Sequence, residues 1–369
     1  MQKNSTTNAL EDHSSTIDRA DLVRRIKEHG LKLGFTDIGI ARAEVSSASP
    51  ELHRWLELGR HGEMDYMAKH AELRARPEAL LPGTLSVISA RLPYWPEAAE
   101  SARVLANSAL GYVSRYALGR DYHKTMRQRL QKLAEYIQEE LAAYPEATPF
   151  IYRAFADSAP VMEVEFARQS GIAWRGKHTL SLTRSGSWHF LGEIYINLHL
   201  PPDQPTEEHC GSCQSCLEAC PTRAIVAPYQ VDARLCISYL TIELKGAIPP
   251  DLRPLIGNRI YGCDDCQLCC PWNRFAQIGD PDFAVRHALD STPLTQLMAW
   301  DAQEFEDKLA GSPIRRIGHE RWLRNIAVAL GNGPPTAATH RALTSRLDHP
   351  SALVREHVGW ALSIRTGSE

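Results

Sequence analysis

The chain has 369 residues with 41 Lys and Arg, 44 Asp and Glu, and a formal net charge of −3, which excludes a globally basic nucleic-acid-binding protein. Its polar, acid-bearing start differs from a signal or transit peptide, and no run approaches the ~20 apolar residues of a membrane span. We therefore expect a cytoplasmic, monomeric protein of two or three domains with no membrane partner.

The first 200 residues alternate between helix-like and strand-like patterns after a polar tail, residues 1–18, that we expect to be disordered. Alternation of this kind predicts an α/β (α+β) domain over residues 19–200. The expected strands are 37–41, 85–90 and 150–155, with a hairpin of 179–183 and 188–196, and the expected helices include 126–141 and 161–169. The proline-rich segment 201–205 is predicted to be a linker to the next domain.

All nine cysteines lie between Cys210 and Cys270. The spacing Cys210-x2-Cys213-x2-Cys216-x3-Cys220-Pro221 is typical of bacterial ferredoxins with two four-iron four-sulfur clusters, in which the fourth cysteine binds the other cluster. Counting then fills both clusters. The first takes Cys210, Cys213, Cys216 and Cys270, the second takes Cys220, Cys236, Cys263 and Cys266, and Cys269 is left as a spare thiol. Residues 201–280 are therefore predicted to form a ferredoxin-like domain.

Zinc and disulfides are the alternative uses of these cysteines. Zinc ribbons use paired C-x2-C units, and a third cysteine at the same spacing does not belong to that pattern. Disulfides are typical of secreted chains, and we expect this one to stay in the cytoplasm. Both alternatives are disfavoured.

The C-terminal part, residues 281–369, changes composition again. From Gly311 to Glu369 there are eight arginines, no lysine and four acids. Apolar spacing between residues 322 and 330 predicts one helix, and two more are expected near 336–347 and 351–364, as in a HEAT-like repeat. The arginines fit either a local nucleic-acid contact or a solvated face of a small helical cap.

Several stretches along the chain together are similar to the epoxyqueuosine reductase family. They are residues 74–77, 120–123, 157–163, 176–178, 191–193 and 237–243, the cysteine pattern, and 312–316 with 323–332. The cysteine spacing alone is generic, and the combination is specific. The polar tail and Cys269 are departures from the family pattern that leave the proposed chemistry intact.

The resemblance implies reductive deoxygenation of epoxyqueuosine to queuosine at the wobble position of tRNA, the last step of queuosine biosynthesis. It also implies cobalamin in the N-terminal domain. The sequence lacks the Asp-x-His-x-x-Gly signature of a histidine-ligated corrin, which fits a base-off cofactor with no protein ligand beneath cobalt. Single electrons would come through the clusters from a reducing partner such as flavodoxin or ferredoxin. Cobalt reduced to Co(I) would attack the epoxide carbon.

Asp157 is the candidate general acid, because the opening epoxide develops an alkoxide that needs a proton. Burial would raise the pKa of this carboxyl and keep it protonated near neutrality. The alternative is an N-cap of a helix that starts near Pro160.

The resemblance implies further contacts. Arg74, Lys177 and His178 are expected to bind the corrin side chains or nucleotide tail, and Ser238 to lie between cofactor and cluster. Tyr122 and His123 are expected to line the substrate pocket, although a core histidine is an equal alternative for His123. Arginines near the C-terminus are expected to bind phosphates of the anticodon stem-loop: Arg315, Arg316, Arg321 and Arg324.

Two other functions fit part of the sequence. A cobalamin-dependent reductive dehalogenase also combines a corrin with two clusters, but it resembles exported proteins. A ferredoxin-type electron carrier explains the cysteines and leaves the N-terminal domain unexplained.

Overall fold

A four-stranded antiparallel sheet forms the centre of the N-terminal part. The structure, a computed structural model, describes residues 17–144 and 149–366, so nearly all of the tail predicted to be disordered lies outside the described residues. The strand order is β1-β2-β7-β4, and every neighbouring pair is antiparallel. The strands are β1 (Asp37–Arg42), β2 (Ser86–Pro93), β7 (His189–Ile196) and β4 (Tyr152–Phe155). The domain is therefore of the α+β kind, without the parallel pairs of a βαβ fold.

The predicted hairpin of 179–183 with 188–196 is wrong. Strand β7 pairs with β2 and β4 in the middle of the sheet, whereas β6 (Ser181–Leu182) pairs with β5 (Trp174–Arg175). Seven of the eight residues of β7 are buried, and a run of that kind gains more from a central position than from a two-stranded ribbon.

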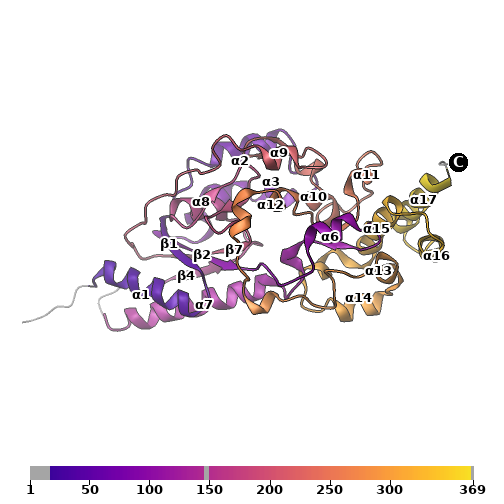
Figure 1. Cartoon of the computed structure of the whole chain (residues 1–369). Coiled ribbons are helices and arrows are strands. Elements are labelled where there is room, and N and C mark those ends of the chain that lie inside the picture. The colour runs from indigo at the N-terminus through magenta and orange to yellow at the C-terminus, as the bar shows by residue number, and fades with distance from the viewer. Residues whose placement is uncertain (1–16, 145–148, 367–369) are drawn as a thin grey trace, which may run out of the picture.

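Helices cover both faces of the sheet (Figure 1). Ile88, Ile194 and Ile196 point to one face and share a core with α1 (Arg19–Lys32) and α7 (Tyr122–Leu141). Alternate residues such as Val87 and Tyr195 point to the other face, toward α8 (Glu163–Gln169). This period of two fixes the strand register, because a slip of one residue would turn each isoleucine away from the helices. The start of α8 is tied to the chain just after β4 by a hydrogen bond from the Asp157 N–H to the Glu163 carboxyl.

Short helices follow β1 and β2. They are α2 (Ser49–Glu57), α3 (Asp65–Lys69), α4 (Ala71–Ala75), α5 (Pro77–Leu80), α6 (Ser101–Ala106) and the 3-10 turn η1 (Arg115–Ala117). Strand β3 (Tyr112–Val113) pairs in parallel with β10 (Arg259–Tyr261), and Ala117 and Leu118 are buried in the core of the C-terminal helices. Residues 112–118, which the sequence assigned to the first domain, thus tie the first and last parts together.

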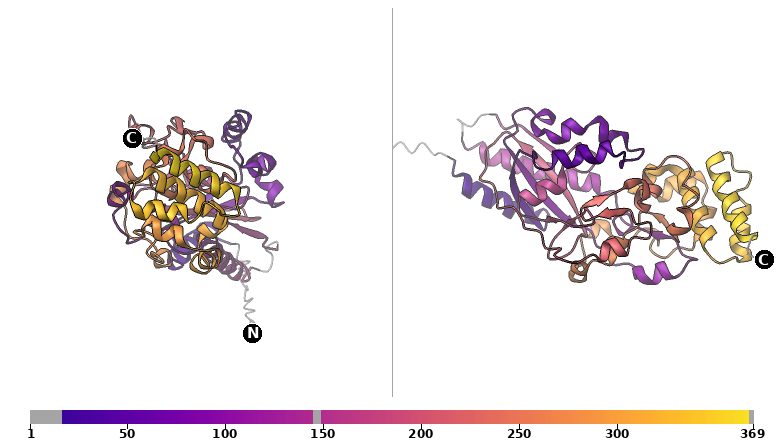
Figure 2. Two further views of the ribbon diagram at one scale, coloured as in Figure 1. Left: turned by 90° about the vertical axis from the view of Figure 1, so that its right-hand side faces the viewer. Right: turned by 90° about the horizontal axis from the view of Figure 1, so that it is seen from above.

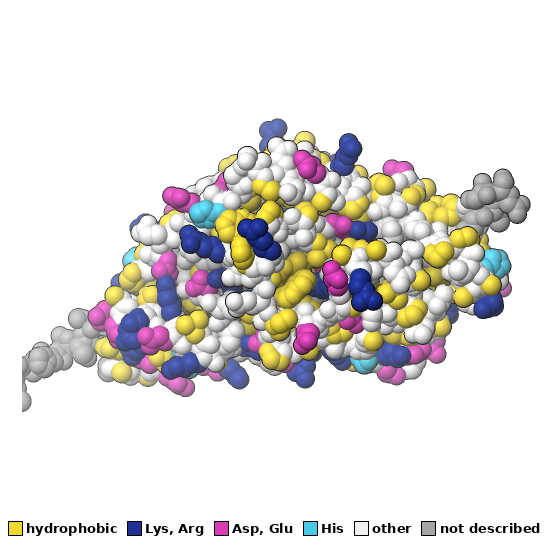
Figure 3. All heavy atoms as spheres, viewed as in Figure 1, with side chains coloured by type: hydrophobic (Ala, Val, Ile, Leu, Met, Phe, Trp, Pro, Cys, Tyr) yellow, Lys and Arg dark blue, Asp and Glu magenta, His cyan; other side chains and the backbone are white. Residues whose placement is uncertain are grey.

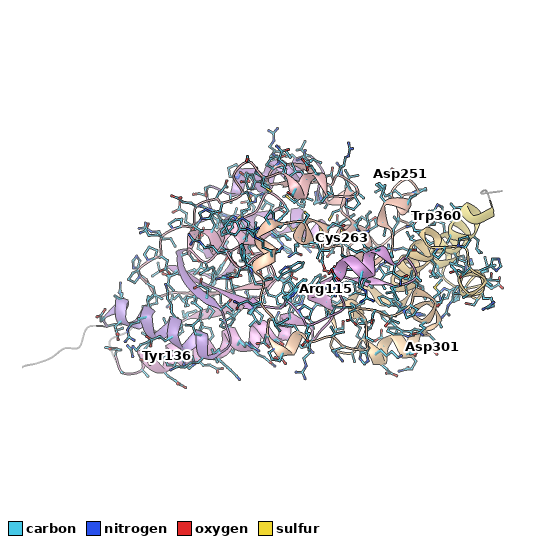
Figure 4. All side chains as sticks on the ribbon, viewed as in Figure 1. Arg115, Tyr136, Asp251, Cys263, Asp301 and Trp360 are labelled. Atoms are coloured by element: carbon cyan, nitrogen blue, oxygen red, sulfur yellow. The ribbon has the colours of Figure 1, made fainter. Side chains whose placement is uncertain are left out.

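The cysteine region contains only short elements joined by loops. They are α9 (Ser215–Glu218), β8 (Ile225–Ala227), β9 (Gln230–Val231), η2 (Ala233–Leu235), α10 (Ile237–Ile242), α11 (Arg253–Ile256), α12 (Asp265–Leu268), η3 (Pro271–Phe275) and η4 (Pro281–Phe283). Figure 4 places Cys263 near the middle of the molecule, between the sheet and the C-terminal helices. The predicted linker is packed rather than free, because the Asp203 carboxylate accepts hydrogen bonds from Lys27 Nζ and the Ile40 N–H.

Helices at the C-terminus form one end of the elongated molecule (Figure 2). They are α13 (Leu294–Ala299), α14 (Ala302–Lys308), η5 (Pro313–Ile317), α15 (Gly318–Asn332), α16 (Ala337–Thr344) and α17 (Ala352–Thr366). The three predicted helices correspond to α15, α16 and α17. Helix α15 is the most buried of these, with Trp322, Leu323 and Ile326 fully enclosed.

The prediction that Arg324 binds tRNA is wrong, because this side chain has an exposed fraction of 0%. Its guanidinium donates to the carbonyl oxygens of Leu240, Leu244 and Gly246 at 2.7–2.8 Å. Arginine suits this position because its planar fork carries five donors, enough for several carbonyls at once. Arg324 therefore joins α15 to α10 and to the loop after it.

Replacing Arg324 with alanine should destabilise the protein by roughly 3 kcal/mol or more, because the buried carbonyls of Leu240 and Leu244 lose their donor. The midpoint of thermal unfolding under anaerobic conditions measures the effect. Arg341→Ala, at an exposed position on α16, is the matched control and should stay within about 0.5 kcal/mol of the parent. Equal midpoints for the two variants would contradict this role.

Candidate active site

A cavity of ≈ 460 Å³ lies between the sheet domain and the cysteine region. Aromatic and aliphatic side chains form much of its wall, including Tyr122, Phe190 and Leu191. The rings of Tyr122 and Phe190 stack with centroids 4.0 Å apart. Asp157, Glu163, His178 and Ser238 supply polar groups to the same wall. A largely apolar cavity with a few polar groups is typical of small-molecule and cofactor sites.

The cysteines divide into two groups of four. Cys220, Cys236, Cys263 and Cys266 line the large cavity, whereas a second cavity of ≈ 240 Å³ is lined by Cys210, Cys213, Cys216 and Cys270. These are the two sets expected from the sequence. Cys269 lines neither cavity, and its thiol lies 3.5 Å from the Cys266 carbonyl oxygen. All nine cysteines are free, in contrast to the disulfide alternative.

Burial raises the pKa of the Cys263 and Cys266 thiols well above the ordinary value. A buried thiol becomes a thiolate when a nearby cation compensates its charge, and iron supplies such charge in an iron–sulfur cluster. Each of the two cavities is lined by four thiols, and this arrangement fits two clusters.

Asp157 lies at the edge of the large cavity, and its side chain has an exposed fraction of 52%. Its backbone is left-handed, with φ of 55°, a strained conformation for a non-glycine residue that is often found at functional sites. The Asp157 N–H donates to Glu163 Oε1 at 2.6 Å. Helix α8 begins at Glu163 with Met162 as its N-cap, so the N-cap alternative for Asp157 is wrong.

The expected rise in the pKa of Asp157 is also wrong. Burial acts to raise this pKa, but hydrogen bonds from His123 and Tyr122 lower it more, and the net shift is downward. The Tyr122 hydroxyl donates to Asp157 Oδ2, and His123 Nε2 lies 2.9 Å from the same oxygen. Donors that favour the ionised form explain the direction. Asp157 is therefore ionised near neutrality in this arrangement.

Glu163 has the property that the sequence analysis assigned to Asp157. Burial and the neighbouring negative charge of Asp157 raise the pKa of Glu163 to about 8. Glu193, on β7, is fully buried and has no hydrogen-bond partner within the described part of the chain, and burial raises its pKa well above the usual value. Sequence reasoning missed both carboxyls, although they end two of the family-like stretches, 157–163 and 191–193.

His123 lies behind Asp157 and is almost fully buried. Its Nδ1 is 2.7 Å from Oδ1 of Asp121, the residue that caps α7. Arg316 reaches this pair from η5, with Nη2 donating to Asp121 Oδ2 at 2.9 Å. His123 is thus neither a wall of the cavity nor an ordinary core residue. No role was predicted for Asp121 from the sequence, although it lies in the family-like stretch 120–123.

His178 fits the expected corrin contact. It lines both cavities, and burial lowers its pKa to about 4, so the imidazole is neutral. Its Nδ1 accepts the Leu180 N–H at 3.2 Å, which places the ring hydrogen on Nε2. That buried Nε2 has no partner among the described residues. A donor left unpaired in a cavity wall fits an amide carbonyl of a corrin.

The remaining expected corrin contacts lie in different places. Ser238 lines the large cavity. Arg74 is buried, is not among the residues that line this cavity, and donates to the Tyr66 carbonyl oxygen. Lys177 lines the smaller cavity, where Nζ donates to the Gly211 and Cys213 carbonyl oxygens at 2.7 and 2.9 Å. The Lys177 side chain is directed to those carbonyls and therefore holds the first cysteine loop. This differs from the expected corrin contact.

Among the expected tRNA contacts, Arg315 and Arg316 are exposed. Arg315 pairs with Glu306, and Arg316 pairs with Asp121. Arg321 donates to the carbonyl oxygens of residues 242, 316 and 317, so its guanidinium is occupied by the fold. Acidic and basic side chains are mixed over the face shown in Figure 3. A nucleic acid would therefore meet individual arginines on this face rather than a broad basic surface.

Comparison with known proteins gives matches over nearly the whole chain. Residues 74–158 match the family model "Epoxyqueuosine reductase QueG, DUF1730", and residues 209–273 match the "4Fe-4S double cluster binding domain". Epoxyqueuosine reductase of Pseudomonas aeruginosa is 55% identical over 360 residues, which cover 97% of this chain and 98% of that protein. The Escherichia coli protein of the same name is 54% identical, covering 95% of this chain and 91% of that one.

Solved structures agree with the sequence relatives. An epoxyqueuosine reductase with a tRNA-Tyr epoxyqueuosine-modified stem loop has a TM-score of 0.85 at 28% identity, covering 94% of this chain and 91% of that one. The Streptococcus thermophilus enzyme has a TM-score of 0.82 at 26% identity, with coverage of 95% and 92%. The sequence identity over nearly full length, the family models and the shared fold agree: this chain belongs to the epoxyqueuosine reductase family.

Proposed function

We propose that this protein reduces epoxyqueuosine to queuosine at the wobble position of tRNA, the last step of queuosine biosynthesis. The observation that carries the proposal is one cavity that brings a set of four cysteines together with Asp157. Electron delivery and proton delivery therefore meet at the same place. We further propose that the protein acts as a monomer in the cytoplasm, where its tRNA substrate is found. Within the described residues, no helix is long and apolar enough to cross a membrane.

Base-off cobalamin is the proposed cofactor of the large cavity. The apolar wall and the unpaired His178 Nε2 support it, since a corrin offers flat apolar surface and amide oxygens. When bound, cobalamin would supply a strongly nucleophilic, reduced cobalt for opening the epoxide. Arg74 and Ser238 are proposed to complete the polar contacts at its edge.

Two four-iron four-sulfur clusters are the proposed route for electrons. Cys210, Cys213, Cys216 and Cys270 would hold one, and Cys220, Cys236, Cys263 and Cys266 the other. When bound, they would supply single-electron chemistry, with a protein such as flavodoxin or ferredoxin as the proposed reductant. The first set includes an exposed member, Cys213, whereas the second set lines the large cavity, which favours entry of electrons at the first set.

Asp157 is the proposed proton donor to the epoxide oxygen. The Tyr122 hydroxyl and His123 hold its carboxyl at the cavity, so the group is oriented before the substrate arrives. Because its pKa is lowered, Asp157 must receive the proton that it donates. An alkoxide is far more basic than a carboxylate, so transfer from protonated Asp157 is strongly downhill.

An assay of the protein with cobalamin, iron–sulfur clusters and a reductant distinguishes this function from its alternatives. The absorbance spectrum of bound cobalamin separates both cobalamin enzymes from a ferredoxin-type carrier. Conversion of an epoxyqueuosine-bearing stem-loop, with no dehalogenation of halogenated phenols, then separates a reductase from a dehalogenase. Dehalogenation without conversion of the stem-loop would overturn the proposal. The family assignment does not favour either alternative.

Arg315 is expected to contribute one phosphate contact to tRNA. Arg315→Ala should lower affinity for the stem-loop and reduce the slope of log affinity against log salt by about one unit. Binding titrations at several salt concentrations measure both. The double variant Arg315→Ala with Arg316→Ala tests the pair, although Arg316 also holds Asp121. Arg19→Ala, on α1 at the far end of the molecule (Figure 1), is the control. Unchanged affinity and slope in the Arg315 variants would make these arginines a solvated surface only.

A further inference from the structure

The proposed reaction consumes more protons than the single one that Asp157 can hold. Removing the oxygen of an epoxide breaks two C–O bonds, forms one C=C bond and releases water. This consumes two electrons, which the protein reductant supplies, and two protons. One carboxyl holds one proton, and Asp157 is ionised near neutrality because its pKa is lowered. Asp157 must therefore be reprotonated in each turnover.

His123 is the group whose geometry meets this need. Its Nε2 lies 2.9 Å from Asp157 Oδ2, within the hydrogen-bond reach that proton transfer requires. Its Nδ1 lies 2.7 Å from Asp121 Oδ1. The ring is 6% exposed and stacks on Tyr122 with centroids 4.1 Å apart. Both nitrogens are thus fixed, one toward a carboxylate behind it and one toward the carboxylate at the cavity.

We propose that His123, held in orientation by Asp121, returns a proton to Asp157 in each turnover. This inference rests on the proposed function. The Nε2–H bond breaks as the Oδ2–H bond of Asp157 forms, and His123 then regains its proton from solvent. His123 acts through Asp157 and is a positioning and proton-supplying residue, whereas Asp157 is the group at the cavity. The arrangement resembles a hydrolase triad, in which an aspartate orients the histidine that transfers the proton.

The charges around His123 favour its protonated form. Burial lowers its pKa, but the hydrogen bonds to Asp121 and Asp157 raise it more, so the net shift of its pKa is upward. Arg316 faces the ring, with Nη1 3.0 Å from Nε2, and opposes the rise. Glu163, on α8, also interacts with His123, and its pKa of about 8 keeps the Glu163 carboxyl mainly neutral at pH 7. Tyr122 donates its hydroxyl to Asp157 rather than to the ring.

Asp121 orients the ring without carrying the proton. Burial acts to raise the pKa of Asp121, but His123 and Arg316 lower it to about 2, so this carboxylate stays ionised throughout the working range of pH. Arg316 is half exposed, which puts solvent next to the outer end of the Asp121–His123–Asp157 line. His123 carries its proton below its raised pKa and loses it as the pH rises through that pKa, so proton supply to Asp157 should weaken at alkaline pH.

The first test is the pH profile of turnover for His123→Gln. In the parent protein, turnover should fall as the pH rises through the raised pKa of His123. Glutamine retains a hydrogen-bonding amide but does not titrate, so the variant should lose about 10²-fold in turnover and lose this alkaline fall. His340→Gln, at an exposed position on α16, should match the parent. Turnover within twofold of the parent, or a reduced turnover that keeps the same alkaline fall, would overturn the proposal.

A second measurement is independent of turnover. NMR titration of ¹³C-labelled histidines in the full protein should show His123 titrating above the ordinary histidine pKa of about 6.5, and Asp121→Asn should lower that value. A His123 that titrates at or below 6.5 in the parent would overturn the proposal even if the variants fail to fold. Failure of the proposed function is distinguishable, because a parent protein that binds but does not convert epoxyqueuosine-bearing tRNA contradicts that function whatever value His123 shows.

Discussion

Replacing Asp157 with asparagine is expected to lower turnover by about 10²–10⁴-fold, the range for loss of a general acid. The amide nearly matches the carboxyl in shape, so both clusters and cobalamin should remain bound. Reduction of the cofactor should also survive, because that step takes up no proton from Asp157. Turnover of the loaded protein under anaerobic conditions, with iron and cobalamin content measured on the same sample, gives the result.

The matched control is Asp251→Asn. Asp251 is exposed and lies away from the middle of the molecule where Cys263 is found (Figure 4). This control should keep the activity of the parent. Because Asp157 is not the N-cap of α8, a change in helix stability does not account for lost activity. Near-normal turnover of the folded, loaded Asp157→Asn variant would remove Asp157 from the mechanism.

Replacing Cys236 with serine is expected to remove one cluster, so that the iron content falls from about eight to about four per chain. Cys236 is distant in sequence from the other cysteines, yet it lines the large cavity with Cys220, Cys263 and Cys266. Serine is a poor iron ligand because it lacks the soft thiolate sulfur. Iron analysis and the visible absorbance of anaerobically reconstituted protein measure the loss.

Cys269→Ser is the internal control for this experiment. Cys269 lies within the same run of cysteines but lines neither cavity, so its variant should keep about eight irons. Loss of a cluster in Cys269→Ser, or retention of both in Cys236→Ser, would show that the two sets of four are assigned wrongly.

The cysteine groups were predictable because ferredoxin spacing carries its own geometry. Three cysteines two residues apart sit on one loop, and a cysteine before proline leaves that loop, so Cys270 was expected beside Cys210 and is found lining the same cavity. The long helix α7 was predictable from its helical apolar period, and strand β2 from a short continuous apolar run, which is typical of a buried central strand. Pairing was less accessible: β7 was expected in a hairpin, because alternation does not say which strand a buried strand will join.

The proton-handling residues were only half predictable. Asp157 was identified from the family resemblance, but its pKa depends on Tyr122 and His123, which are 35 and 34 residues away and reach it only through the packing of α7 against the sheet. The positive charge of the C-terminal region likewise led to the prediction that all four of its named arginines contact tRNA. Arg324 and Arg315 look equivalent in the sequence, yet one caps buried carbonyls and the other is exposed. Burial of a charged side chain is decided by tertiary contacts rather than by composition.

Nucleoside mass spectrometry of the product tests the central proposal most directly. An anticodon stem-loop carrying epoxyqueuosine is incubated anaerobically with the reconstituted protein and a low-potential reductant, then digested and analysed. The proposed function predicts queuosine, lighter than the substrate nucleoside by one oxygen atom, and no product when either cobalamin or the reductant is omitted. Unchanged epoxyqueuosine in the complete reaction, with both clusters and cobalamin bound, would contradict it.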